Sequence, residues 1–155
     1  MTQAAAMPNA VTIREAGESD LAAVLALYAQ PGLDDGQVLG IEEARRVFAR
    51  FSLYPDYHLY VAVLDGTVVG TFALLIMDNL AHLGTPSGVV EDVVVAAECR
   101  SQGIGRRMME FARARCAERG CYKLALSSNL KRERAHQFYD DLGFDRHGYS
   151  FHISP

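Results

Sequence analysis

A short basic turn with two glycines has the residue types that bind anionic ligands. It follows the apolar run Val93–Val95 and reads Arg100-Ser101-Gln102-Gly103-Ile104-Gly105-Arg106. Glycines let a ligand approach the backbone closely, and a helix beginning near Ile104 presents unpaired N–H groups and the positive end of its dipole. This arrangement suits a pyrophosphate. A tight strand-to-helix turn that binds nothing has the same short pattern, so the turn alone leaves both interpretations open.

The composition indicates an ordinary globular domain. The 155 residues carry a formal net charge of −4, and 50% of them are hydrophobic. The negative charge argues against a general nucleic-acid binder, and the apolar runs are shorter than the ~20 residues of a membrane span. The cysteines (Cys99, Cys116 and Cys121) form no CxxC pair, which favours a reduced, cytoplasmic protein, and we expect no metal site. We expect a flexible leader over residues 1–9 and one domain over residues 10–155.

Hydrophobic periodicity predicts alternating strands and helices on both sides of the glycine turn. Asp65-Gly66 is a strong hairpin signal between two of the strands. The order of elements, βααβββαβαβ, predicts a mixed α/β domain. The expected strands cover 11–14, 57–64, 68–77, 89–95, 122–127 and 149–153, and the expected helices cover 21–29, 41–51, 104–119 and 134–142.

Two blocks of the sequence resemble the GCN5-related N-acetyltransferase (GNAT) superfamily. The segment from Arg100 to Gly105 is similar to the [QR]xxGx[GA] signature of that superfamily, and the segment from Ala135 to Phe144 resembles its (A)xxFYxxxGF block. The segment Glu91 to Val95 resembles its fourth strand. The resemblance implies the GNAT fold, in which a central twisted mixed sheet is flanked by helices and splayed at an acetyl-CoA site.

The resemblance also implies that the chain uses acetyl-CoA as a cosubstrate. The backbone of the strand before the turn is expected to pair with the pantetheine arm as an added strand would, and the N–H groups of the turn are expected to hold the pyrophosphate. The full cofactor-binding set implied in this way is Val93, Val94, Val95, Arg100, Ser101, Gln102, Gly103, Ile104, Gly105, Arg106, Asn129, Arg134 and His136.

Members of the family transfer the acetyl group directly to an amine, without an acyl-enzyme. The resemblance places Tyr139 near the CoA sulfur as general acid, and the ordinary pKa of tyrosine near ~10 suits protonation of a thiolate. Tyr139 also lies at helical spacing from Ala135 and Leu142, which is typical of core packing. Neither Cys99 nor Cys116 has an evident histidine base, so both are expected to be structural.

Two neighbouring carboxylates, Glu91 and Asp92, are candidates for the base that deprotonates the amine. Because side chains alternate along a strand, only one of them can face the substrate. Glu91 lies on the same face as Val93 and Val95 by this alternation, so we select it as base or water-positioning residue, with Asp92 second. A solvated or ion-paired carboxylate at a strand end is the alternative. A backbone N–H among residues 93–95 is the expected oxyanion donor.

The C-terminal half resembles two subfamilies, the aminoalkylphosphonate and the glucosamine-6-phosphate N-acetyltransferases. Both accept small amines that carry a phosphorus oxyanion. The resemblance therefore implies an N-acetyltransferase for the primary amine of a small molecule, with a phosphate or phosphonate on that molecule as one option. The candidates for pairing with such a group are Lys131, Arg132, Arg134 and His152. For Lys131 and Arg132, the alternative is a solvated loop charge. The acceptor region is expected within residues 28–52 and 78–88, and its aromatic candidates are Tyr28, Tyr54, Tyr57 and His82.

Two other functions remain open at this stage. One is a non-catalytic acyl-CoA-binding sensor module, and the other is an acetyltransferase that acts on a protein or peptide amine. We further expect a homodimer with neither nucleic-acid nor membrane partners.

Overall fold

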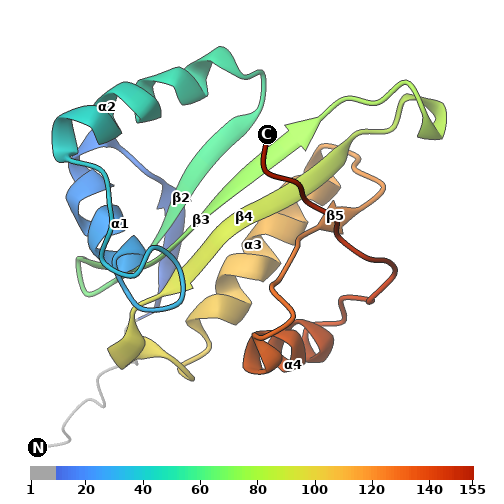
Figure 1. Cartoon of the computed structure of the whole chain (residues 1–155). Coiled ribbons are helices and arrows are strands. Elements are labelled where there is room, and N and C mark those ends of the chain that lie inside the picture. Colours follow the sequence, from blue (N-terminus) through green and yellow to red (C-terminus); the bar gives the residue numbers. More distant parts are fainter. Residues whose placement is uncertain (1–9) are drawn as a thin grey trace, which may run out of the picture. The chain divides into compact units, whose positions relative to one another are not determined.

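A computed structural model describes residues 10–155, so the leader predicted for residues 1–9 lies outside the described part. The chain divides into two compact units, the first ending at Ala125 and the second comprising Leu126–Pro155 (Figure 1). Within residues 10–155, no helix is both long and apolar enough to cross a membrane.

The first unit is built on a five-stranded sheet whose strand order follows the sequence. The first three pairings are antiparallel, and the last pairing, between β4 and β5, is parallel. Asp65 and Gly66, which join β2 to β3, both have positive φ, as a two-residue hairpin turn requires. The mixed sheet and its first hairpin are therefore confirmed. The strands are β1 (Thr12–Glu15), β2 (Tyr57–Leu64), β3 (Thr67–Met77), β4 (Ser87–Val95) and β5 (Leu124–Ala125).

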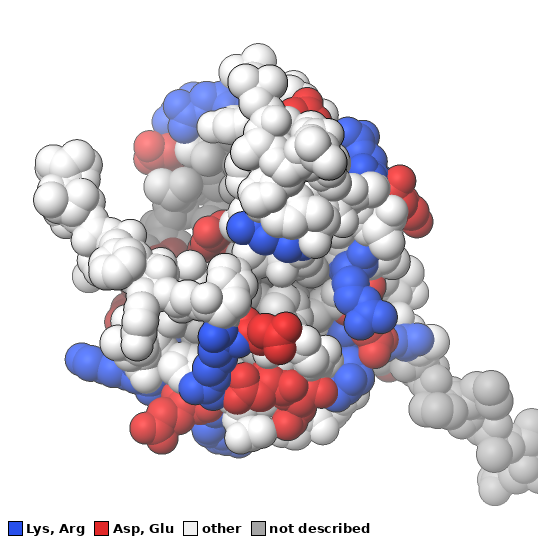
Figure 2. Space-filling view, turned by 90° about the vertical axis from the view of Figure 1, so that its right-hand side faces the viewer, with Lys and Arg blue, Asp and Glu red and all other residues white. Residues whose placement is uncertain are grey.

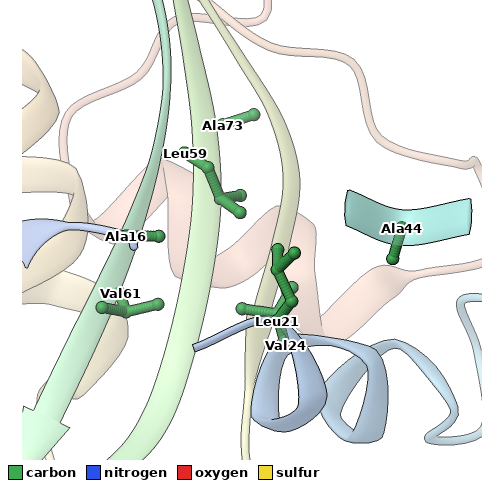
Figure 3. Close-up of a cluster of buried hydrophobic side chains, with 7 residues drawn as sticks. All are labelled: Ala16, Leu21, Val24, Ala44, Leu59, Val61 and Ala73. Atoms are coloured by element: carbon green, nitrogen blue, oxygen red, sulfur yellow. The ribbon is translucent and has the colours of Figure 1, made fainter. Parts of the chain in front are cut away.

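Helices cover both faces of this sheet (Figure 1). On one face, α1 (Leu21–Tyr28) and α2 (Ile41–Ala49) pack against alternate residues of the strands. Leu21 and Val24 of α1 meet Leu59 and Val61 of β2 in a cluster of buried side chains that also includes Ala16, Ala44 and Ala73 (Figure 3). Burial of each large apolar side chain contributes about 1.5–3 kcal/mol, so this cluster holds the two helices on the sheet.

The opposite face carries α3 (Ile104–Glu118), which packs closely because two strand positions have no side chain. A Cβ on Gly70 of β3 would lie 2.8 Å from the Sδ of Met108, and one on Gly88 of β4 would collide with the Sγ of Cys116. Met108 is fully buried, and Cys116 is nearly so. The close fit fixes α3 against β4, and so fixes the N-terminus of the helix relative to the strand that leads to it.

Short 3-10 turns connect these elements. Residues 50–51 were predicted as the end of the second helix, but α2 ends at Ala49 and these residues begin a tighter 3-10 turn. The turns cover Glu18–Asp20, Arg50–Leu53, His82–Gly84 and Ala97–Cys99.

The second unit contains α4 (Glu133–Asp141), which confirms the helix predicted at 134–142. The strand predicted at 149–153 is wrong: these residues adopt no regular structure, and Tyr149, Phe151 and Ile153 are about nine-tenths exposed. Their alternation is typical of a strand, but a strand also needs a neighbouring backbone to bond, and no ladder includes them within the described residues. The strand predicted at 122–127 is likewise reduced to β5, two residues long.

Candidate active site

The parallel pair β4 and β5 separates after two residues, and this leaves one edge of β4 open. The pairing joins Gly88 to Leu124 and Val89 to Ala125, and β4 then continues to Val95 with β3 on its other side. Within the described residues, no strand pairs with this edge beyond Val89. An extended ligand that carries amide groups can add there as a strand does. Residues 93–95, predicted to bind pantetheine, lie on this open stretch.

The open stretch of β4 contains a β-bulge. Thr71 pairs with Val94 and Ala73 pairs with Glu91, so β4 carries one more residue than β3 over this interval. Asp92, within the bulge, has a φ of 53°, in the left-handed region that non-glycine residues rarely adopt. A bulge re-aims backbone groups and side chains, and strained residues of this kind are concentrated at functional sites.

The bulge overturns the alternation predicted for Glu91. Ala73 belongs to the core under α1 and α2, so its partner Glu91 lies on that face of the sheet. The extra residue inverts the pattern, and Val94 therefore shares the face of Glu91, whereas Val95 pairs with Gly70 on the α3 face. Glu91 and Val95 were predicted to share one face, and this is wrong because the bulge adds one residue between them.

The glycine turn connects the open end of β4 to α3. Ser101 (φ 63°) and Gly103 (φ 79°) are both left-handed, and Gly103 is the residue that precedes the first turn of the helix. No side chain caps this end of α3, and the first amide that bonds back into the helix is that of Arg107, to the carbonyl of Gly103. The N–H groups of Ile104, Gly105 and Arg106 thus have no acceptor within the helix. Free N–H groups of this kind suit an anion, and here they lie directly after the open strand.

The arginines near the glycine turn form a small group of positive charges. Arg100, Arg106 and Arg107 are all exposed, and Arg107 also donates to the carbonyl of Val11 at 3.2 Å. On the face displayed in Figure 2, basic and acidic side chains are interspersed. The arginines that adjoin the free amides therefore add positive charge at one place, which suits a phosphate group more than a long polyanion.

On the α1 and α2 side of the bulge, carboxylates and phenols influence one another. Glu91 and Asp92 reach solvent, yet partial burial raises the pKa of both carboxyls, and the charge of Asp92 raises that of Glu91 further. Burial and then the charge of Asp92 raise the pKa of Tyr28 and of Tyr57, while a hydrogen bond with Thr71 acts in the opposite direction on Tyr28. A carboxylate with a raised pKa is a better proton acceptor near neutral pH.

The second unit holds the remaining predicted residues. Tyr139 of α4 packs against Phe138 and Phe144, with ring centroids at 5.1 and 5.6 Å, and burial raises the pKa of its phenol. A role in packing and a role as general acid are therefore compatible for Tyr139, because the ring packs against its neighbours while the raised pKa keeps the phenol protonated. The ring Nε2 of His136 bonds the carbonyl of Asn129 at 2.8 Å. This hydrogen bond of His136 holds the loop before α4 in place.

The side chain of Asn129 is partly committed to this loop as well. Its Oδ1 accepts the N–H of Lys131 at 2.9 Å, which closes a local turn. Arg134 is exposed in the first turn of α4. Asn129, Arg134, His136 and Tyr139 thus occur together around one loop and one helix, while the predicted residues between Glu91 and Arg106 all lie in the first unit.

Sequence reasoning missed two contributors. Asp34, after α1, adds to the raised pKa of Asp92 and so lies near the bulge, although no sequence pattern had singled it out. Gln30 bonds the end of β4, as described below. Among the aromatic candidates, Tyr54 contacts Tyr57, while His82 stacks on Tyr122. Within residues 10–155, no three His, Cys, Asp or Glu side chains gather in a way that would hold a metal ion.

Comparison with known proteins gives consistent results. The sequence profile described as "Acetyltransferase (GNAT) family" matches residues 21–144. Aminoalkylphosphonate N-acetyltransferase of Salmonella typhimurium is 31% identical over 113 residues, which cover 73% of each chain. Glucosamine 6-phosphate N-acetyltransferase of Trypanosoma brucei brucei is 34% identical over 82 residues, which cover 53% of this chain and 54% of the relative.

Solved structures show the same similarity. A putative acetyltransferase from Agrobacterium tumefaciens superposes with a TM-score of 0.85 at 32% identity, covering 93% of this chain and 99% of the other. A protein described as a transcriptional regulator from Bacillus halodurans gives a TM-score of 0.87 at 28% identity, covering 94% and 99%.

Proposed function

Since the chain belongs to the GNAT family of acetyltransferases, we propose that it transfers the acetyl group of acetyl-CoA to the primary amine of a small molecule. The observation that carries this proposal is the succession of an open β4 edge, a left-handed glycine turn and an uncapped helix N-terminus. The edge offers amide groups to a pantetheine arm, and the free N–H groups of the turn suit a pyrophosphate. One ligand, coenzyme A, has both parts in this order.

The residues present fit the cosubstrate. Unpartnered N–H groups of residues 104–106 would hold the pyrophosphate, assisted by Arg100 and Arg106. Residues 93–95 would pair with the arm. When bound, acetyl-CoA supplies the acetyl group as a thioester. The remaining chemistry consists of two proton movements, which this chain can provide.

We assign the base to Glu91 or Asp92, because both carboxyls have raised pKa values and adjoin the bulge. The base takes the proton of the incoming ammonium group. We assign the general acid to Tyr139, because partial burial raises the pKa of its phenol, which can donate its proton to the leaving sulfur. A backbone N–H of the bulge is the proposed donor to the oxygen on which negative charge develops.

The first acceptors to test are amines that carry a phosphate or phosphonate, because two relatives are named for such amines. A suitable panel contains glucosamine 6-phosphate, aminomethylphosphonate and aminoethylphosphonate, with polyamines and aminoglycosides as a second class. Release of CoA is followed with a thiol reagent. We expect turnover with at least one phosphorylated amine; turnover with the second class alone would contradict the substrate preference.

The similarity to a protein described as a transcriptional regulator favours one second candidate, an acyl-CoA sensor. The same panel separates the two functions, because a sensor binds CoA without turning over any amine. We also propose that the chain forms a homodimer, which sedimentation equilibrium with and without CoA measures directly.

A further inference from the structure

The side chain of Gln30 bridges both sides of the junction between β4 and the glycine turn. Its Oε1 accepts the N–H of Ala97 at 2.7 Å, and its Nε2 donates to the carbonyl of Val95 at 3.3 Å. The same Nε2 donates to the carbonyl of Leu27 at 3.2 Å, within the last turn of α1. One amide group therefore satisfies an acceptor and a donor that lie on either side of Ala96.

The backbone of Ala96 is fixed from the other direction. Its N–H donates to the carbonyl of Val69, the residue before Gly70 in β3, at 2.8 Å. The exit of β4 is thus held by β3 at Ala96 and by Gln30 at the two flanking residues. This sets the direction in which the chain leaves the strand and enters the turn that carries the free N–H groups.

The direction matters because one ligand must contact both parts. A coenzyme A molecule that pairs with the β4 edge and places its pyrophosphate on the N–H groups of residues 104–106 gains affinity from both only if their spacing is correct. Displacement of either part by about 1 Å removes much of such a gain. Neither Val95 nor Ala97 has a side chain that could fix this spacing.

We propose that Gln30 is a positioning residue that sets the spacing between the pantetheine-binding edge and the pyrophosphate-binding turn. This inference rests on the proposed function. It assigns to Gln30 an effect on the affinity for the intact cosubstrate, exerted through Val95 and Ala97, and no part in the proton movements. The residue lies in the last turns of the α1 region, far from the turn in sequence, and its role follows only from these contacts.

The test compares Gln30→Glu with wild type by titration calorimetry, using CoA and ADP as probes. Glutamate keeps an oxygen that can accept the N–H of Ala97, but its second oxygen replaces the Nε2 that donates to the carbonyls of Val95 and Leu27. Because oxygen then faces oxygen, we expect the Kd for CoA to rise about tenfold or more. ADP, which reaches only the turn, should bind both proteins within about twofold of each other, because it gains nothing from the spacing. The KM for acetyl-CoA should follow the Kd for CoA, while kcat stays within about threefold.

Two further variants keep the result interpretable. Gln30→Met removes all three side-chain hydrogen bonds of Gln30 without adding charge, so it replaces Gln30→Glu if that variant does not fold. Gln137→Glu is the matched control: the same change breaks an exposed bond from Gln137 Nε2 to Asp141, in the second unit, and should leave the Kd for CoA unchanged.

The outcomes are distinct. A selective loss of CoA affinity supports the proposal. Equal weakening of CoA and ADP binding, or unchanged CoA binding in both Gln30 variants, overturns it while the proposed function stands. Failure of the wild-type protein to bind CoA at all overturns the proposed function, and this inference with it.

Discussion

Replacement of Gly103 by alanine separates the backbone geometry of the turn from its ligand contacts. Gly103 has a φ of 79°, and a Cβ added there meets no atom within 4 Å. The cost to the free protein is therefore conformational only, about 1–2 kcal/mol for an L-residue held in the left-handed region. For a chain of this size, that corresponds to a fall in Tm of about 2–8 °C.

Binding should be affected more strongly than stability. The added methyl group either intrudes where the backbone approaches a ligand or moves the residue out of the left-handed region and turns the N–H groups away. Loss of one charge-assisted hydrogen bond costs about 1.5–3 kcal/mol. We therefore expect the Kd for CoA to rise about 10- to 100-fold, measured by titration calorimetry on protein whose Tm is recorded in parallel.

Gly66 supplies the matched control. It has a φ of 76°, a Cβ there also meets no atom within 4 Å, and it lies in the hairpin between β2 and β3. Gly66→Ala should lower the Tm by a similar amount and leave CoA affinity unchanged. Equal CoA affinity in Gly103→Ala and wild type would refute the assignment of the turn, as would an equal loss of affinity in Gly66→Ala.

Three further predictions concern catalysis and packing. Tyr139→Phe should lower kcat about tenfold or more and abolish the fall in rate at alkaline pH. In wild type, this fall should occur above the pH at which an ordinary tyrosine loses its proton, because burial raises the pKa of Tyr139. An unchanged pH–rate profile in the variant would exclude Tyr139 as the general acid. A general base acts in its deprotonated form, so the wild-type rate should rise with pH, with a midpoint above the pKa of an ordinary carboxyl. Glu91→Gln should remove this rise and lower kcat about 10-fold or more. If only Asp92→Asn has these effects, the base is Asp92. Gly88→Ala should lower the free energy of unfolding by about 1–3 kcal/mol in denaturant, because the new Cβ collides with Cys116. Adding Cys116→Ala to this variant should remove part of that cost. Additive effects of the two changes would contradict the close contact between Gly88 and Cys116.

Much of the fold could be predicted from periodicity, because most elements bury one regular face. The run of apolar residues in β2 reflects burial on both faces of the sheet, and the helical spacing in α1 reflects packing on one face. The predicted bounds of both elements therefore agree with the structure within a few residues. The segment 149–153 shows where this reasoning ends. Its apolar alternation indicates a strand, but alternation reports side chains, and a strand is stabilised by a neighbouring backbone that the local sequence cannot specify.

The backbone conformation of the candidate site could be predicted only in part. The glycine turn could be predicted because its conformation needs a specific residue, and Gly103 does adopt positive φ. The bulge could not, because one extra residue in β4 leaves the run Glu91–Val95 looking like any strand, and the faces of Glu91 and Val95 were therefore assigned incorrectly. Gln30 is a half-buried polar residue of ordinary type, and only the distances to Val95 and Ala97 give it a role.

Above all, we propose that this chain moves an acetyl group from acetyl-CoA to an amine. The most direct measurement follows one turnover with acetyl-CoA labelled in the acetyl group, with mass spectrometry of the small molecules and of the protein. We expect the label to appear on the nitrogen of an acceptor amine, with an equal amount of free CoA and none of the label on the protein. Label that stays on acetyl-CoA with every amine, while CoA binds tightly at the turn, would contradict the claim and leave a binding module.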